Sequence, residues 1–191
     1  VCLAVSTAAP AVDCNQNAIT DSFEANPTRR GLAGGYWTGQ TYTLLRAGRL
    51  DATIDFDWGQ TGFSVPGYTQ PFTNDFAIRW TGSVITPAVA GDYRFEVEHN
   101  DGCRLWVNGR LLVGAWAEGG GSTHSGTITL AANARYAIRL EYFENTGDAK
   151  VELRWQVPET TTAVVIPSGA FRPIYDQNAN NVPDECELAA D

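Results

Sequence analysis

Apolar and polar residues alternate with a period of two in successive segments between Gly31 and Tyr175. Tyr93–His99 is the clearest case: Tyr, Phe and Val occupy positions 93, 95 and 97, and Arg, Glu and Glu occupy positions 94, 96 and 98. This alternation is typical of a strand with one buried and one solvated face. By the same pattern we predict further strands at Phe76–Thr81, Cys103–Asn108, Arg110–Val113, Ser125–Leu130, Tyr136–Phe143, Lys150–Gln156 and Ala163–Ile166.

Residues that favour turns separate these segments. Asn108-Gly109 predicts a tight type I′ hairpin, since both residues readily adopt positive φ. His99–Gly102 predicts another turn, and no stretch has the period of a convincing amphipathic helix. We therefore predict an all-β fold, an antiparallel β-sandwich or barrel, with Cys103 on an inward strand face where it can be a buried thiol.

Composition restricts the partners. Lys and Arg number 13 against 22 Asp and Glu, which gives a formal charge of −9. Nucleic-acid binders need a basic face, so we expect no nucleic-acid partner. No apolar run approaches the roughly 20 residues of a membrane span, so we expect no membrane insertion. The 191 residues suffice for one domain with short appendages.

Cysteine and methionine usage points to export. Methionine is absent, which indicates that the chain starts after its initiator. The cysteines Cys2, Cys14, Cys103 and Cys186 lie far apart without a C-x-x-C pair, which fits long-range disulfides better than a zinc site. We expect a secreted or cell-surface protein.

Several motifs, in this order, resemble a PA14 domain. After Gly31-Leu32 and Tyr36 they are Phe76–Gly82, Gly91–Phe95, Asn100–Gly109, Tyr136–Tyr142 and Leu153–Trp155. The resemblance covers about three quarters of the chain, and the segment around Asp101-Gly102 is its most specific part. It implies a β-sandwich or barrel used in adhesins, toxins and carbohydrate-active enzymes, and adhesion or sugar binding rather than catalysis.

The resemblance also implies a possible sugar and calcium site. Calcium-dependent PA14 lectins hold the ion with two successive aspartates, whereas this chain has Asn100-Asp101. An amide oxygen still coordinates calcium, but the lost charge should lower affinity. The alternative is a β-turn in which Asp101 accepts backbone amides. Trp106 and Trp116 could stack on a sugar ring or simply pack.

Two twelve-residue segments outside the strands have the spacing of an EF-hand calcium loop. Both place oxygen ligands at positions 1, 3, 5 and 9, a backbone carbonyl at 7 and a glutamate at 12. The predicted ligands are Asp13, Asn15, Asn17, Ile19 (carbonyl), Asp21 and Glu24 in the first loop, and Asp176, Asn178, Asn180, Val182 (carbonyl), Asp184 and Glu187 in the second. The cofactor expected is therefore Ca²⁺; the alternative is a polar, Asn-rich surface linker.

These loops are similar to those of dockerins and thrombospondin type 3 repeats. Both depart at position 6, where Ala18 or Asn181 replaces the usual glycine. Loops of this type usually pair, and cysteine stands at position 2 of the first and position 11 of the second, so we predict a Cys14–Cys186 disulfide. Cys2 and Cys103 are then left, either to pair with each other or to stay free. The pairing can occur within one chain or, head to tail, between chains.

A catalytic site is weakly supported, because the two histidines, His99 and His124, could at best join Ser125 and Asp101 without a nucleophile motif. We predict a non-enzymatic, extracellular calcium-binding module of structural or adhesive role that self-assembles through its ends into a surface polymer or filament. The alternative is a calcium-dependent carbohydrate-binding, lectin-like module using Asn100, Asp101 and Trp116. The predicted divisions are an N-terminal segment at 1–26, the β-sandwich at 27–175 and a C-terminal loop at 176–191.

Overall fold

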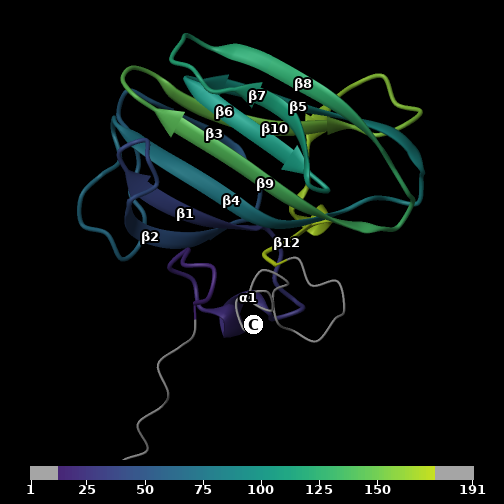
Figure 1. Ribbon diagram of the computed structural model, residues 1–191, viewed down its shortest axis with the longest axis horizontal. Helices are drawn as coiled ribbons and strands as arrows, with labels where there is room; N and C mark the ends of the chain where they lie inside the picture. The colour runs from purple at the N-terminus through teal and green to yellow at the C-terminus, as the bar shows by residue number, and fades with distance from the viewer. Residues whose placement is uncertain (1–12, 175–191) are drawn as a thin grey trace, which may run out of the picture.

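Two β-sheets pack face to face in a sandwich (Figure 1). The structure is a computed structural model, and it describes residues 13–174. The second predicted calcium loop, with Cys2 and Cys186, lies outside the described residues. The predicted antiparallel β-sandwich is confirmed.

Sheet A has the strand order β2-β1-β4-β9-β6-β7, with β12 added beside β4. Its strands are β1 (Leu32–Thr38), β2 (Leu44–Asp51), β4 (Phe76–Ile85), β6 (Gly102–Val107), β7 (Arg110–Ala115), β9 (Arg135–Glu144) and β12 (Phe171–Arg172). Sheet B has the order β11-β10-β5-β8, with β3 also paired to β10. Its strands are β3 (Asp55–Gly59), β5 (Gly91–Asn100), β8 (Ser122–Leu130), β10 (Ala149–Gln156) and β11 (Val164–Val165). The two short helices described are α1 (Asp21–Glu24) and the 3-10 turn η1 (Ser168–Ala170).

The inner faces of the sheets form one aromatic-rich core. Tyr93, Phe95 and Val97 of β5 are fully buried there, as their alternation predicted, against residues of sheet A such as Trp80 and Tyr142. Each predicted strand is present with ends shifted by a few residues. Asn108 and Gly109 both have positive φ, as the predicted hairpin requires. Burial raises the pKa of the Cys103 thiol to about 12, so this free cysteine is a buried, inert thiol, as expected.

A buried carboxylate joins the three strands at one edge of sheet A. Asp51 at the end of β2 accepts hydrogen bonds from the Trp80 indole at 2.7 Å and from the Tyr36 hydroxyl, and Arg49 donates to it at 2.6 Å. A buried charge is costly unless it is paired and hydrogen-bonded. This network therefore fixes β1, β2 and β4 in one arrangement.

The amino-terminal loop, which we define as Asp13–Glu24, packs on the edge strand β2. Gly48 lies beneath it, and a methyl group at that position would collide with the Asn17 carbonyl oxygen. Ile19 is 8% exposed, so it anchors the loop against the domain. In Figure 1 the loop and α1 lie at the end of the sandwich near β12. The loop thus packs against the β-sandwich.

Candidate carbohydrate-binding groove

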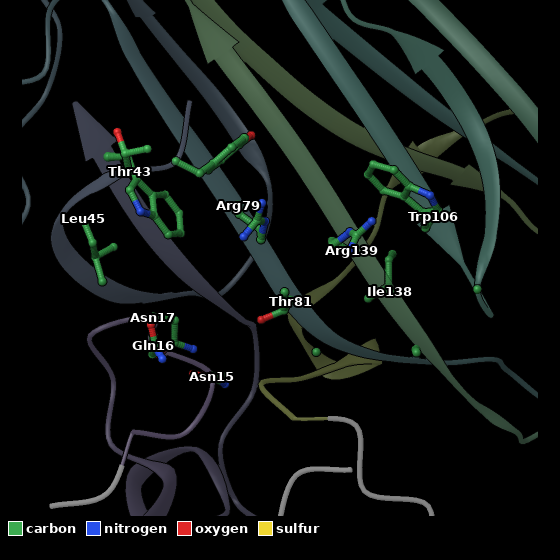
Figure 2. Close-up of a pocket in the computed structure, with 15 residues that line it drawn as sticks. Asn15, Gln16, Asn17, Thr43, Leu45, Arg79, Thr81, Trp106, Ile138 and Arg139 are labelled. Carbon is green, nitrogen blue, oxygen red and sulfur yellow. The ribbon is translucent and has the colours of Figure 1, made fainter. Parts of the chain in front are cut away.

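A groove of about 810 Å³ lies between the amino-terminal loop and the outer face of sheet A. Polar residues of the loop form one wall, and side chains of β1, β4, β6 and β9 form its floor and the other wall. It is lined by Asn15, Gln16, Asn17, Trp37, Tyr42, Thr43, Leu45, Arg79, Thr81, Gly82, Trp106, Gly109, Ala137, Ile138 and Arg139. In Figure 2, Arg79 and Arg139 stand in the middle of the groove, between Trp106 on one side and Thr43 and Leu45 on the other.

Strand register produces the arginine cluster on this face. Glu141 of β9 lies directly opposite Arg79 of β4 and Arg104 of β6. Arg79 donates to Glu141 at 2.9 Å and Arg104 donates at 2.6 Å, while Arg139 lies 3.7 Å away from it. Opposite charges at facing positions stabilise neighbouring strands. Three arginines thus share one carboxylate, which is 3% exposed.

Aromatic rings hold these arginines in place. The guanidinium carbon of Arg79 lies 4.3 Å from the Tyr42 ring centroid, that of Arg104 lies 3.9 Å from Trp116, and that of Arg139 lies 3.9 Å from Trp106. Tyr42 and Trp116 in turn stack on each other with centroids 6.2 Å apart. Cation–π contacts of this kind restrict the arginine side chains. The face therefore presents ordered cations beside flat apolar rings.

Glycine makes room for another indole ring of the groove, that of Trp37. Trp37 lies over Gly35, where a Cβ atom would collide with the indole. Trp37 also contacts Tyr42 edge-on, with the centroids 5.1 Å apart. The indole is consequently laid flat against β1, and Trp37 is only 6% exposed.

The sequence prediction did not include these arginines or Tyr42. Trp106 was named as a ring that could stack on a sugar, and it does line the groove, but Trp116 contacts Tyr42 and Phe143 rather than lining it. The sequence did contain a signal for the arginines. Each of three predicted strands has an arginine at a position that alternation places on the outward face of the sheet: Arg79, Arg104 and Arg139. Which strands become neighbours is fixed by the topology, and this is not readable from the spacing.

The predicted ligands of the amino-terminal loop converge in the structure. Glu24, at position 12, is 1% exposed and accepts hydrogen bonds from the amides of Asn17 at 2.8 Å and Asn15 at 3.3 Å. Asp13 accepts from the backbone amides of Asn17 at 3.1 Å and Ala18 at 2.9 Å. Asp21 accepts from the Cys14 amide at 3.1 Å. The acidic side chains of the loop thus form hydrogen bonds within the loop, and Glu24 accepts from Asn15 and Asn17 at positions 3 and 5.

Position 6 of this loop has the backbone conformation that an EF-hand loop needs. Ala18 has a φ of 66°, the left-handed region that a glycine usually fills there. Within residues 13–174, no three side chains of His, Cys, Asp or Glu are grouped so that they could hold a metal ion. A calcium ion in this loop would therefore need the amide oxygens of Asn15 and Asn17 and the Ile19 carbonyl as well as the acids. The disulfide predicted for Cys14 involves Cys186, outside the described residues, and stays a prediction.

The structure places Asn100 and Asp101 at the crossing from sheet B to sheet A. Asp101 is 8% exposed, and its two carboxylate oxygens accept the backbone amides of Gly119 at 2.9 Å and Asn145 at 2.7 Å. The Asn100 side chain accepts from the Asp101 amide at 3.2 Å. Asp101 therefore braces three loops through backbone hydrogen bonds, the arrangement expected of the turn alternative.

Glu144 lies beside Asp101 and was not predicted from the sequence. It is fully buried, its Oε2 accepts from the Tyr142 hydroxyl at 3.1 Å, and its Oε1 has no donor among the described residues. Burial, together with the Asp101 carboxylate, raises the pKa of Glu144 to about 7. The surroundings of Glu144 thus favour its protonated form.

The residues considered for catalysis do not assemble into a nucleophile–base–acid array. His99 and His124 contact each other through ring nitrogens 2.9 Å apart, and burial lowers the pKa of His99. Ser125, on the other side of β8, accepts a hydrogen bond from Arg94 at 3.1 Å. Asp101 contacts His99 only through its backbone carbonyl oxygen, at 2.7 Å.

Among the described residues, no helix has the length and apolar character to cross a membrane.

Comparisons with known proteins agree with the fold. The chain is 34% identical over 149 residues to the anti-sigma-I factor RsgI3 of Acetivibrio thermocellus, a match that covers 78% of this chain and 22% of that protein. It is 30% identical to a solved anti-sigma factor domain-containing protein from Clostridium clariflavum, with a TM-score of 0.68, and covers 48% of that structure and 78% of this chain. The PA14 sugar-binding domain of an RTX adhesin is 20% identical, with a TM-score of 0.62, over 76% of this chain and 99% of that one. The chain thus spans about a fifth and about half of its two anti-sigma relatives. The model of the PA14 domain family matches residues 28–169, and the chain belongs to that family.

Proposed function

We propose that this protein is a non-catalytic carbohydrate-binding module, and that the groove on the outer face of sheet A is its binding site. The observation that carries the proposal is the juxtaposition of Trp37, Tyr42 and Trp106 with polar loop residues around a cavity of about 810 Å³. That volume lies in the range of sites for small ligands. Aromatic rings cover the apolar faces of sugars, and amides, hydroxyls and guanidinium groups bond their hydroxyls.

Relatives support a sugar-binding role without transferring a specific ligand. The RTX adhesin domain is described as sugar-binding, but at 20% identity its likeness concerns the fold. The anti-sigma relatives are much longer than the chain, so their regulatory activity is not assigned to it. A carbohydrate-binding module acts where glycans are, which fits the secreted or cell-surface location expected from the sequence.

Calcium is proposed to hold the polar wall of the groove. Asn15 and Asn17 are at once predicted calcium ligands and residues of that wall. Ala18 supplies the required φ, and Glu24 is turned inward beneath both asparagines. Calcium prefers six to eight such oxygens, so binding would rotate the asparagine amides and replace their bonds to Glu24.

Two alternatives remain as separate hypotheses. A second cation site beside Asp101 is favoured by the Glu144 oxygen that lacks a donor among described residues.

Head-to-tail self-assembly through the terminal loops rests on the sequence alone, and the amino-terminal loop already packs on β2 of its own chain. Sedimentation with and without a chelator, under reducing conditions, tests the assembly: particles should dissociate to monomers if calcium and disulfides join them.

The experiment that tests the proposed function is a glycan array followed by calorimetry. We expect the wild-type protein to bind a subset of glycans and Trp106→Ala to lose that binding while keeping its unfolding midpoint close to wild type. Leu111→Ala is the matched control, because Leu111 is 50% exposed and does not line the groove. Absence of any glycan binding by the wild-type protein, with calcium present, would refute the proposal.

A further inference from the structure

We propose that the groove selects carboxylated sugars, so that its ligand is a uronate-containing saccharide; this inference rests on the function proposed above. The first observation is its charge. Two arginines, Arg79 and Arg139, line the groove, and none of its lining residues is Asp or Glu. The whole chain carries a formal charge of −9. On an acidic protein, the arginines make the sheet A side of the groove locally positive, and such a field favours an anionic ligand there. The carboxylate of Glu24 lies behind Asn15 and Asn17 in the opposite wall.

The second observation is how the neighbouring carboxylate is used. Glu141 is 3% exposed and accepts from Arg79 and Arg104. One carboxylate faces three guanidinium groups, so the cluster keeps a net positive charge. An arginine carries five N–H donors, and the bonds to Glu141 use only one from Arg79 and one from Arg104. The other N–H groups of Arg79 have no hydrogen-bond acceptor among the described residues, so they can donate to a ligand.

The third observation concerns Arg139. Its side chain is 46% exposed, and its Nε lies 3.7 Å from Glu141, too far for a hydrogen bond. Trp106 fixes the guanidinium plane from one side, at 3.9 Å. A planar, ordered guanidinium with open donors binds a carboxylate in bidentate fashion. Arg139 is accordingly the group that we assign to the uronate carboxylate.

Neutral polar residues around the arginines suit a sugar rather than another anion. Thr43 and Thr81 line the groove with Asn15 and Asn17. Thr81 lies directly opposite Arg139 in the register of β4 and β9. A uronate presents a carboxylate and several ring hydroxyls together, which matches one guanidinium beside hydroxyl and amide groups. The mixture of charged, aromatic and neutral polar groups thus selects a carboxylated ring.

Calorimetry with three chemically matched ligands tests this inference. They are a short oligogalacturonate, its fully methyl-esterified form, which has the same shape without the charge, and a neutral oligogalactose. We expect the free acid to bind wild-type protein about tenfold or more tighter than the ester, as a charge-assisted bidentate contact would give. Arg139→Gln should lose this preference while its affinity for the ester stays within about twofold.

Arg154→Gln is the matched control, because it removes the same charge from sheet B, where Arg154 pairs with Glu98 and Glu152. Equal binding of acid and ester, or an equal loss in both variants, would overturn the selectivity and leave the sugar-binding function intact. Oligoglutamate that binds as tightly as the uronate would also overturn it, since the sugar ring would then be irrelevant. A wild-type protein that binds glycans of the array but not the uronate overturns this inference alone, whereas one that binds no glycan refutes both proposals.

Discussion

Arg79 donates a hydrogen bond from Nε to Oε1 of Glu141, at 2.9 Å, across the outer face of sheet A. Glu141→Gln removes the charge that holds Arg79 and Arg104 together and leaves guanidinium groups facing one another. We expect the free energy of unfolding to fall by about 1.5–3 kcal/mol, the usual range for hydrogen bonds to charged groups. Urea denaturation measures this loss. Glu96→Gln is the control, since its partner Arg94 is 47% exposed and such a pair contributes less than about 1 kcal/mol; equal losses in both variants would contradict the special role of Glu141.

Ala18→Gly should strengthen calcium binding to the amino-terminal loop. A φ of 66° costs an alanine on the order of 1 kcal/mol, and glycine avoids most of that cost. We expect a severalfold lower calcium dissociation constant by calorimetry. The control is Ala52→Gly, at a bend outside the loop. Unchanged or weaker calcium binding by Ala18→Gly would show that position 6 does not limit the loop.

Glu24→Gln should abolish most calcium binding by the same loop. The carboxylate at position 12 supplies two oxygens to the ion in loops of this kind, and an amide supplies one without charge. We expect affinity to fall by about tenfold or more. Glu118→Gln, an equal change of charge at an exposed residue beyond the loop, should bind calcium like wild type. If neither variant affects binding, the ion is held elsewhere and the loop is a polar surface segment.

Glu144 should make stability depend on pH. Burial and the neighbouring Asp101 raise its pKa from an ordinary 4.5 to about 7. A group whose pKa is higher in the folded state stabilises the protein fully below its unfolded pKa, and this contribution is lost as pH rises through the folded value. We therefore expect the wild-type protein to lose on the order of 2 kcal/mol relative to Glu144→Gln between pH 4.5 and 8.

Denaturation in the presence of a chelator at several pH values measures that difference. The comparison between the two proteins removes the contribution of other titrating groups. If the free energies of unfolding of the wild type and of Glu144→Gln changed with pH in parallel, ionisation of Glu144 would not destabilise the folded protein. Recovery of wild-type stability at pH 8 on adding calcium, but not in Asp101→Asn, would support the second cation site.

Alternation identified strands with one solvated face, such as that of β5, most directly. It was not the whole signal, because the mostly buried β4 was predicted and the partly exposed β2 was not. Tyr93–His99 alternates cleanly because its outer face meets solvent, and the structure confirms it within β5. Leu32–Thr38 was missed because β1 lies between two neighbours in sheet A and is buried on both sides, with glycines at 34 and 35 where the backbone meets Trp80 and Trp37. Burial on both faces removes the alternation on which the prediction depends.

The site was less predictable than the fold. Spacing along the chain identified the amino-terminal loop, because all its ligands fall within a dozen residues. The groove joins Asn17, Arg79 and Arg139, which only the pairing of β4 with β9 and the packing of the loop on β2 bring together. Glu144 escaped notice for the same reason: the effect of Asp101 on it depends on a contact between segments that are distant in the sequence.

Because residue 48 is a glycine, the amino-terminal loop lies in direct backbone contact with β2, and this contact would transmit mechanical force. The amino-terminal loop sits directly on the backbone of β2, with Ile19 buried beside it. Tension applied to the chain ahead of Asp13 would therefore reach the edge of sheet A without an intervening hinge. Asn15, Gln16 and Asn17 of the groove wall lie on that path, so a pull on the amino-terminal side would act on the groove.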